Sequence, residues 1–371
     1  MPIPVFRAQL PPQATDAVTK CLQSGWIGYG PECQKLEKAF TFKRGGHALA
    51  TNSCTSALYL AGKLCQRTER DEIIVPAITF VSTAMAFYSA GFRVRLADVD
   101  PDSLLIDPCS VKKLINSNTR AIVIVHLYGQ KAPTAELREL CDRFDIDLIE
   151  DCAHRLDLLD EEPPSGNYAC YSFNAVKEIP CGEGGLLWVK DAADGERVRT
   201  LSNLGLQFDT MQRSATLKHA DYSFSSEVGL KMRLNDIAAS VVNASLESLV
   251  LTRHRRQEIF NYYDDNLKQV TPFINPIKRT GSDSYLMYVA KVSDYSRENL
   301  QSNLARDEIA TSVHYPSLTG HPIFKEAGDS CEKAELLSEQ VVTLPCFLEL
   351  GSSEQERVVQ SLTKAVLNKV S

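Results

Sequence analysis

A lysine lies between two short apolar stretches in YACYSFNAVKEIPCGEGGLL, residues 168–187. The first stretch predicts a buried strand, Lys177 follows in a loop, and a Gly-Glu-Gly-Gly turn precedes a second apolar strand. Upstream, another apolar run ends at Asp151 in DLIEDCAH. Loops on a rigid scaffold often hold catalytic groups. A lysine that forms a Schiff base and an aspartate that pairs with a pyridinium nitrogen are what pyridoxal phosphate (PLP) requires.

PLP also needs partners for its ring and its phosphate. Phe80 opens a predicted helix and would stack on the ring, while His154 would contact the ring oxygen or face. The start of a helix offers free N–H groups to a phosphate dianion. The phosphate candidates are Cys54, Thr55 and Ser56 at such a start, together with Ser172 before the lysine loop.

Each candidate also has a simpler structural explanation. Most lysines are solvated surface residues, and an aspartate or serine at a strand end often caps the next helix. His154 and Phe80 would then be ordinary core residues. The combination of Lys177, the glycine-rich turn and Asp151 favours the chemical interpretation.

Composition restricts the class of protein. The 371 residues are 44% hydrophobic and 23% charged, with a net charge of −7, which is typical of a globular protein. A chain of this length has room for two domains. The sequence has no basic stripe of the kind that would indicate nucleic-acid binding. It also has no apolar run that is long enough for a membrane span. The N-terminus lacks the apolar region of a signal peptide, and eleven cysteines without a CxxC pair indicate reduced thiols in the cytoplasm. We find no spaced His/Cys cluster and expect no metal.

Short apolar strands alternate with helices in the first half of the chain. The predicted strands are residues 48–53, 72–76, 93–99, 121–127 and 147–151, and the helices between them are 54–65, 79–91, 108–116 and 134–144. Such strands predict a parallel sheet covered on both sides, with ligands beyond the carboxyl ends of the strands. Ser53, Pro76, His126 and Asp151 lie at those ends.

The second half predicts a smaller domain. Residues 206–228 form a long polar loop, and 234–267 are helical almost throughout. We expect a large domain over residues 1–251 and a small α/β domain over 252–371. The small domain should hold strands at 284–292 and 310–315 and helices at 296–307, 332–340 and 353–368.

Several ordered motifs carry a family resemblance. They are SGWIGYGP, ATNSCTSAL, IIVPAITFVSTAMAFYSAG, VHLYGQ, EDCAH, SFNAVKEIPCGEGG, MRLNDIAAS and HYPSLTGHPIF. In this order they resemble the DegT/DnrJ/EryC1/StrS family of PLP-dependent sugar aminotransferases over nearly the whole chain. The resemblance implies PLP-dependent fold type I, the aspartate-aminotransferase-like fold, with a mostly parallel central sheet covered by helices.

The resemblance also implies roles. Lys177 would form the Schiff base and move the proton, Asp151 would pair with the ring nitrogen, and His154 and Phe80 would contact the ring. Thr55, Ser56 and Ser172 would hold the phosphate. The family works as a homodimer with shared active sites and typically uses L-glutamate and a nucleotide-linked keto-sugar, so we expect an amino-sugar as product.

The chain departs from the family pattern at four places. Cys54 replaces a glycine of the phosphate loop, Asn174 replaces a common histidine, and the segment 155–166 is atypical. Lys231 stands where the family often has an asparagine that reaches the neighbouring subunit's phosphate. A lysine there would bind the same phosphate or the sugar nucleotide.

Three other functions fit the same motifs less well. A sugar dehydratase of the family would have histidine in place of Lys177. A non-catalytic regulatory protein would not need Lys177, Asp151 and the phosphate loop together. An aminotransferase for dicarboxylic amino acids would need an arginine clamp, which no segment identifies.

Overall fold

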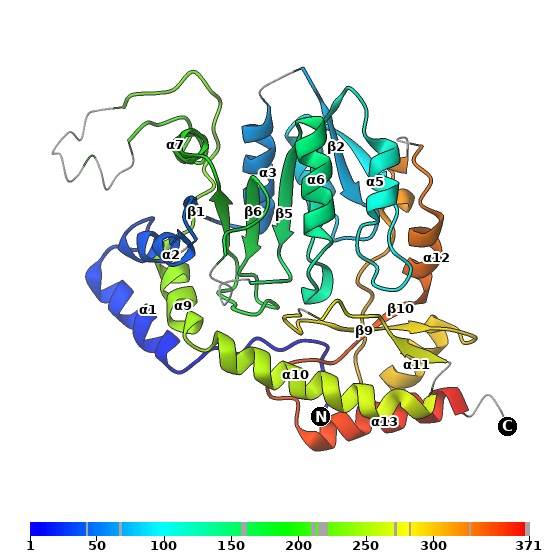
Figure 1. Ribbon diagram of the computed structural model, residues 1–371. Helices are drawn as coiled ribbons and strands as arrows, with labels where there is room; N and C mark the ends of the chain where they lie inside the picture. The colour runs from blue at the N-terminus through cyan, green and yellow to red at the C-terminus, as the bar shows by residue number, and fades with distance from the viewer. Residues whose placement is uncertain are drawn as a thin grey trace.

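The computed structural model describes residues 1–41, 44–66, 69–156, 162–208, 213, 222–270, 273–281, 283–325 and 328–367. Within these residues, seven strands form one sheet in the order β1-β7-β6-β5-β4-β2-β3 (Figure 1). The strands are β1 (His47–Thr51), β2 (Glu72–Pro76), β3 (Arg93–Ala97), β4 (Thr119–Val125), β5 (Asp147–Cys152), β6 (Tyr168–Ser172) and β7 (Gly185–Val189).

The central strands run parallel, as predicted. β6, β5, β4, β2 and β3 pair in parallel in that order, whereas β7 is antiparallel to both β6 and β1. Every residue of β2, β4 and β7 is buried. Strands buried on both faces read as continuous apolar runs, which is why the sequence identifies them.

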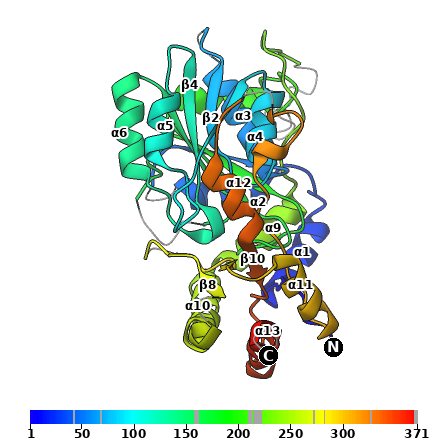
Figure 2. The same ribbon diagram turned by 90° about the vertical axis from the view of Figure 1, so that its right-hand side faces the viewer.

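Helices cover both faces of this sheet. α3 (Cys54–Cys65), α4 (Ser82–Ser89) and α7 (Ala192–Leu201) share a core with one face. α5 (Pro108–Leu114) and α6 (Thr134–Phe144) pack on the other. Figure 2 shows α3 and α4 on the opposite side of the sheet from α5 and α6. Beside β1 and β7, the second face is covered by α2 (Pro31–Thr41) and α9 (Asp236–Leu246), with α1 (Gln13–Ser24) against α9.

A second, antiparallel sheet lies in the C-terminal part, in the order β10-β9-β8. Its strands are β8 (Ile274–Pro276), β9 (Tyr288–Val292) and β10 (Val341–Leu344). They share a separate core with α10 (Leu249–Asn266), α11 (Arg297–Arg306) and α13 (Ser352–Leu367). The α/β fold with a small C-terminal sheet is thus confirmed.

The predicted domain boundary at residue 252 stays a prediction, and two features bear on it. Ile3 is fully buried in the C-terminal core, and its N–H donates to the Glu308 carbonyl at 2.8 Å. α12 (Glu332–Gln340) packs instead with the core of the large sheet. The chain therefore crosses between the two cores near both ends.

One detail of the C-terminal prediction is wrong, and two strands are missing from it. Residues 310–315 form no strand and make only one described bridge, Ser312 with Thr343. The strands β8 and β10 were not predicted. Residues 234–267 are helical almost throughout, as predicted, in two helices: α9 ends at Leu246 and α10 begins at Leu249. No helix among the described residues is long and apolar enough to cross a membrane.

Candidate active site

A cavity of about 390 Å³ lies beyond the carboxyl ends of the central strands, where the parallel sheet predicts a ligand. The end of β5, the start of α3, the start of α4 and the loop after β6 contribute to its wall. From the predicted set, the lining residues are Cys54, Thr55, Phe80, Asp151, His154, Ser172 and Lys177.

Asp151 is held at the end of β5 by three donors. The Ala153 N–H donates to Oδ1 at 3.0 Å, and the Cys54 thiol lies 3.9 Å from the same oxygen. The Thr83 hydroxyl donates to Oδ2 at 2.8 Å. Burial raises the pKa of Asp151, while the Ala153 and Thr83 hydrogen bonds and the charge of Lys177 lower it. These donors orient the carboxylate and favour its ionised form.

Lys177 lies in the loop after β6, which is folded back by the Lys177 N–H bond to the Asn174 carbonyl at 3.0 Å. Its neighbour Glu178 is buried and anchors the loop, because it accepts from Arg253 Nε at 2.9 Å and from the Leu156 N–H at 2.8 Å. Burial lowers the pKa of Lys177 to about 8, against the opposing effects of Cys54 and Asp151. A far larger fraction of this amine is therefore neutral near physiological pH than for an ordinary lysine, whose pKa is 10.5.

The start of α3 offers donors to an anion. The Ser53 hydroxyl caps the helix by accepting from the Ser56 N–H at 3.1 Å, as the simpler interpretation of this serine predicts. Among the described residues, no acceptor is recorded for the N–H groups of Cys54 and Thr55. Two backbone N–H donors and the positive end of the α3 dipole thus lie in the wall of the cavity.

The glycine-rich turn allows β7 to approach this helix start. A Cβ atom on Gly185 would lie 2.5 Å from the backbone nitrogen of Cys54, closer than real Cβ atoms come. Gly184 lines the cavity, and its Cβ would meet the Cys181 sulfur at 2.8 Å. Gly185 is therefore required for the close contact between β7 and the phosphate candidates, whereas Gly184 leaves room for the Cys181 side chain within the lysine segment.

Two predicted residues lie outside the cavity wall. The Ser56 hydroxyl already has a partner in the same segment, because it donates to Asn52 Oδ1 at 2.6 Å. Lys231 is exposed and bridges Asn203 in a strand-like segment away from the cavity. Their cofactor roles remain predictions. Most of the predicted long loop, at 209–212 and 214–221, and part of the atypical segment, at 157–161, lie outside the described residues.

Tyr315 is a site residue to which the sequence assigned no role. The Tyr128 N–H donates to His154 Nδ1 at 3.1 Å, so the ring hydrogen is on Nε2, which donates to the Tyr315 hydroxyl at 3.0 Å. The Tyr315 hydroxyl keeps its own hydrogen for a group in the cavity. His314, beside it, also lines the cavity, and burial lowers its pKa to about 4. The HYP motif carried the only signal for these two residues.

Phe80 lies at the mouth of the cavity. Its side chain is 53% exposed, and its ring centroid is 5.7 Å from that of Tyr315. An aromatic residue exposed at a cavity is available to stack on a bound ring, which is what the sequence predicts for Phe80.

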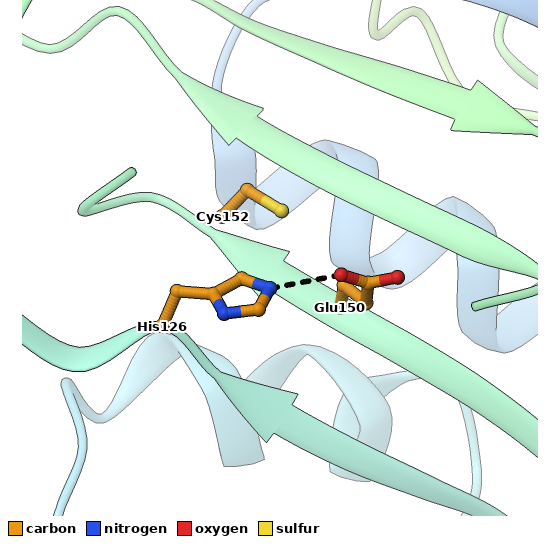
Figure 3. A group of neighbouring side chains, drawn as sticks. All are labelled: His126, Glu150 and Cys152. Carbon is orange, nitrogen blue, oxygen red and sulfur yellow. Dashed lines mark hydrogen bonds and ion pairs between the residues drawn. The ribbon is translucent and has the colours of Figure 1, made fainter. Parts of the chain in front are cut away.

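His126 does not line the cavity, although it follows β4. Its side chain forms a buried group with Glu150 and Cys152, whose potential ligand atoms lie within 4.8 Å of one another (Figure 3). The Ala132 N–H occupies His126 Nδ1 at 3.1 Å, so Nε2 donates to Glu150 at 2.8 Å. Glu150 also accepts from the Gly166 N–H at 2.6 Å. Both histidine nitrogens are thus engaged in hydrogen bonds, through which this group supports the sheet end.

Comparisons with known proteins agree with this geometry. The model of the DegT/DnrJ/EryC1/StrS aminotransferase family matches residues 9–363. The chain superposes on the aminotransferase TlmJ of Streptoalloteichus hindustanus with a TM-score of 0.89, at 25% identity over 100% of both chains. The sugar aminotransferase CalS13 of Micromonospora echinospora is 26% identical over 98% of this chain and 99% of its own, with a TM-score of 0.86. At 23% identity, the PLP form of Spr1654 from Streptococcus pneumoniae shares the fold, with a TM-score of 0.88 over 99% of each chain.

Proposed function

Since this chain belongs to the DegT/DnrJ/EryC1/StrS aminotransferase family of PLP-dependent enzymes, we propose that it transfers the amino group of L-glutamate to a nucleotide-linked keto-sugar. The product would be an amino-deoxysugar. The observation that carries the proposal is one cavity lined by both Lys177 and Asp151. The free state of all eleven cysteines supports a reducing compartment, and we place the reaction in the cytoplasm.

The residues of the cavity fit PLP. Its wall holds an amine whose pKa is lowered and a buried carboxylate oriented by three donors. The N–H groups of Cys54 and Thr55 and the Ser172 hydroxyl would hold the phosphate. When bound, PLP supplies an electron sink for the carbon that loses its proton.

The chain's own residues then have distinct tasks. Lys177 would remove the proton from the amino-acid carbon and return a proton to the sugar carbon, which its pKa of about 8 suits. Asp151 would keep the ring nitrogen protonated. His154 and the Tyr315 hydroxyl, which are hydrogen-bonded to each other, would orient the cofactor oxygen or the substrate. Phe80 would cover one face of the ring and limit water.

A second copy of the chain would complete the site. The segment that contains Lys231 is rich in exposed apolar residues: Leu204, Tyr222, Phe224, Val228 and Leu230 are 44–86% exposed. They lie close together, since Leu206 bridges Phe224 and the Leu204 N–H bonds the Leu230 carbonyl at 3.4 Å. An apolar surface of this kind favours burial against a partner. We infer a homodimer in which Lys231 reaches the phosphate or the sugar nucleotide in the partner's cavity.

The pKa of Lys177 gives a pH prediction. Only the neutral amine attacks an aldehyde, so the rate at which the apoprotein captures PLP should rise through neutral pH, with its midpoint near the pKa of about 8, and level off about one pH unit above it. An ordinary lysine, with a pKa of 10.5, would keep gaining rate for two more pH units. Stopped-flow absorbance measures this rate, with Nα-acetyl-lysine in the same buffers as the control for the ionisation of PLP itself. A protein rate that still climbs between pH 9 and pH 10.5 contradicts the lowered pKa.

The acceptor is tested with a panel of substrates. The purified protein, loaded with PLP, is incubated with L-glutamate and a series of nucleotide-linked keto-sugars, and mass spectrometry detects the products. We expect 2-oxoglutarate together with one aminated sugar. Loss of a sugar hydroxyl without amination would instead indicate a dehydratase, and a colourless protein that shows no glutamate-dependent spectral change would exclude catalysis.

A further inference from the structure

We propose that Thr83, supported by Thr79, is a positioning residue that keeps Asp151 ionised and leaves one of its lone pairs for a cationic N–H group in the cavity. The inference rests on the proposed function and deepens it, because it names what makes the site selective for a cofactor with a protonated ring nitrogen. Thr79, just before α4, and Thr83, in its first turn, line the cavity and are 2% and 1% exposed.

The directions of the hydrogen bonds follow from the chemistry of the groups. An ionised carboxylate only accepts, so the Thr83 hydroxyl must give its single hydrogen to Asp151 Oδ2, at 2.8 Å. The 2.8 Å contact between the Thr79 and Thr83 hydroxyls then has one possible donor, which is Thr79. Thr79 lies in the segment that leads into α4 and Thr83 lies in its first turn, so the contact between their hydroxyls joins the two segments beside Asp151. The two form a directed chain that ends on the carboxylate.

The count of donors leaves one position open. A carboxylate has about four acceptor positions. In the described structure, the Ala153 N–H and the Cys54 thiol approach Oδ1, and Thr83 approaches Oδ2. Burial raises the pKa of the Cys54 thiol, so it stays protonated and is a donor. One position on Oδ2 remains for a ligand.

With Asp151 ionised, every neighbour that fixes it donates: the Ala153 N–H can only donate, and the Thr83 hydroxyl and the Cys54 thiol each direct their hydrogen at the carboxylate. A protonated Asp151 would direct its hydrogen at one of these donors or into the cavity. Its hydrogen bonds would then lose the extra strength that the charge of a carboxylate gives them. The arrangement therefore favours the carboxylate in spite of its burial. A carboxylate with one free position is complementary to a pyridinium N–H and not to a C–H at the same place of a ring.

The test compares two ligands of the same shape. Apoprotein of the wild type and of Thr83→Val is titrated with PLP and with 1-deaza-pyridoxal phosphate, in which a C–H replaces the ring nitrogen. Valine keeps the shape of threonine but lacks the hydroxyl. We expect Thr83→Val to weaken PLP binding by about 10-fold, as for the loss of one hydrogen bond to a charged group, and to leave the affinity for the deaza analogue within about 2-fold.

Three further variants sharpen the comparison. Thr83→Ser retains the hydroxyl and should restore the PLP preference. Thr79→Val acts only through Thr83 and should give a smaller loss in the same direction, and Cys54→Ala, which removes the 3.9 Å thiol contact, should do the same. Equal weakening of both ligands by Thr83→Val, or no weakening of either, overturns the proposal. If the wild-type apoprotein binds neither ligand, it is the proposed function that fails, so the two failures are distinguishable.

Discussion

Replacing Lys177 with alanine is expected to abolish amino transfer while the protein stays folded. Lys177 is the amine that lines the cavity together with Asp151, and desolvation lowers its pKa. Its loss would remove both the covalent anchor of the cofactor and the group that moves the proton. Turnover with glutamate should fall by at least about 10³-fold, in the upper part of the range for a positioned proton-transfer group. The visible absorbance of the PLP-loaded protein should disappear as well.

The matched control is an exposed lysine near the same hairpin. Lys190 follows β7, is exposed, and does not line the cavity, so Lys190→Ala should keep activity and absorbance. Circular dichroism and the thermal midpoint of both apoproteins check the fold. Since a buried amine is costly to desolvate, Lys177→Ala should not lower the midpoint. Activity above one tenth of the wild type in Lys177→Ala contradicts the assigned role.

Asp151→Asn is expected to cause the second largest loss. Asparagine keeps the size of the side chain and one acceptor oxygen for Ala153 or Thr83, but it has no charge to hold the ring nitrogen protonated. The electron sink would then be weaker in the step that removes the proton. We expect kcat to fall by about 10²- to 10³-fold, as when one strong electrostatic contact to the reacting system is lost. Single-turnover kinetics with glutamate measures the loss directly.

A carboxylate at the opposite end of the same strand provides the comparison. Asp147 begins β5 and pairs with Arg120 at 2.5 Å, far along the strand from the cavity. Asp147→Asn should change stability but leave the glutamate half-reaction within about 3-fold, because no charge at the site is altered. If Asp147→Asn and Asp151→Asn slow the half-reaction equally, the effect of Asp151 comes from folding and not from the cofactor.

The strands of the large sheet are predictable from the sequence because both faces of each are buried. β2, β4 and β5 stand out as apolar runs bounded by polar turns. β8 and β10 are not recognisable in the same way. β8 has three residues and includes a proline, and β10 follows directly on the last residue of α12 without a turn residue between them. Their pairing with β9 is decided by tertiary contacts.

Most of the site is predictable because its residues end strands or begin helices. Asp151 and the start of α3 have local signals of this kind, and Lys177 stands out beside the glycine-rich turn. The roles of Thr83 and Tyr315 are not visible in this way, because they depend on partners far along the chain. Thr83 contacts a carboxylate 68 positions away, and Tyr315 contacts a histidine 161 positions away. Lys231 is the opposite case: the sequence suggests a role for it, but it does not line the cavity of its own chain.

The central claim is that the amine of Lys177 binds the PLP aldehyde in a pocket that also holds Asp151. Borohydride reduction of the PLP-loaded protein, followed by proteolysis and mass spectrometry, reads this out at a single residue. The account predicts one phosphopyridoxyl group per chain, on the peptide that contains Lys177, and its loss when glutamate is added before reduction. A label on any other lysine, or no label on a protein saturated with PLP, would contradict it.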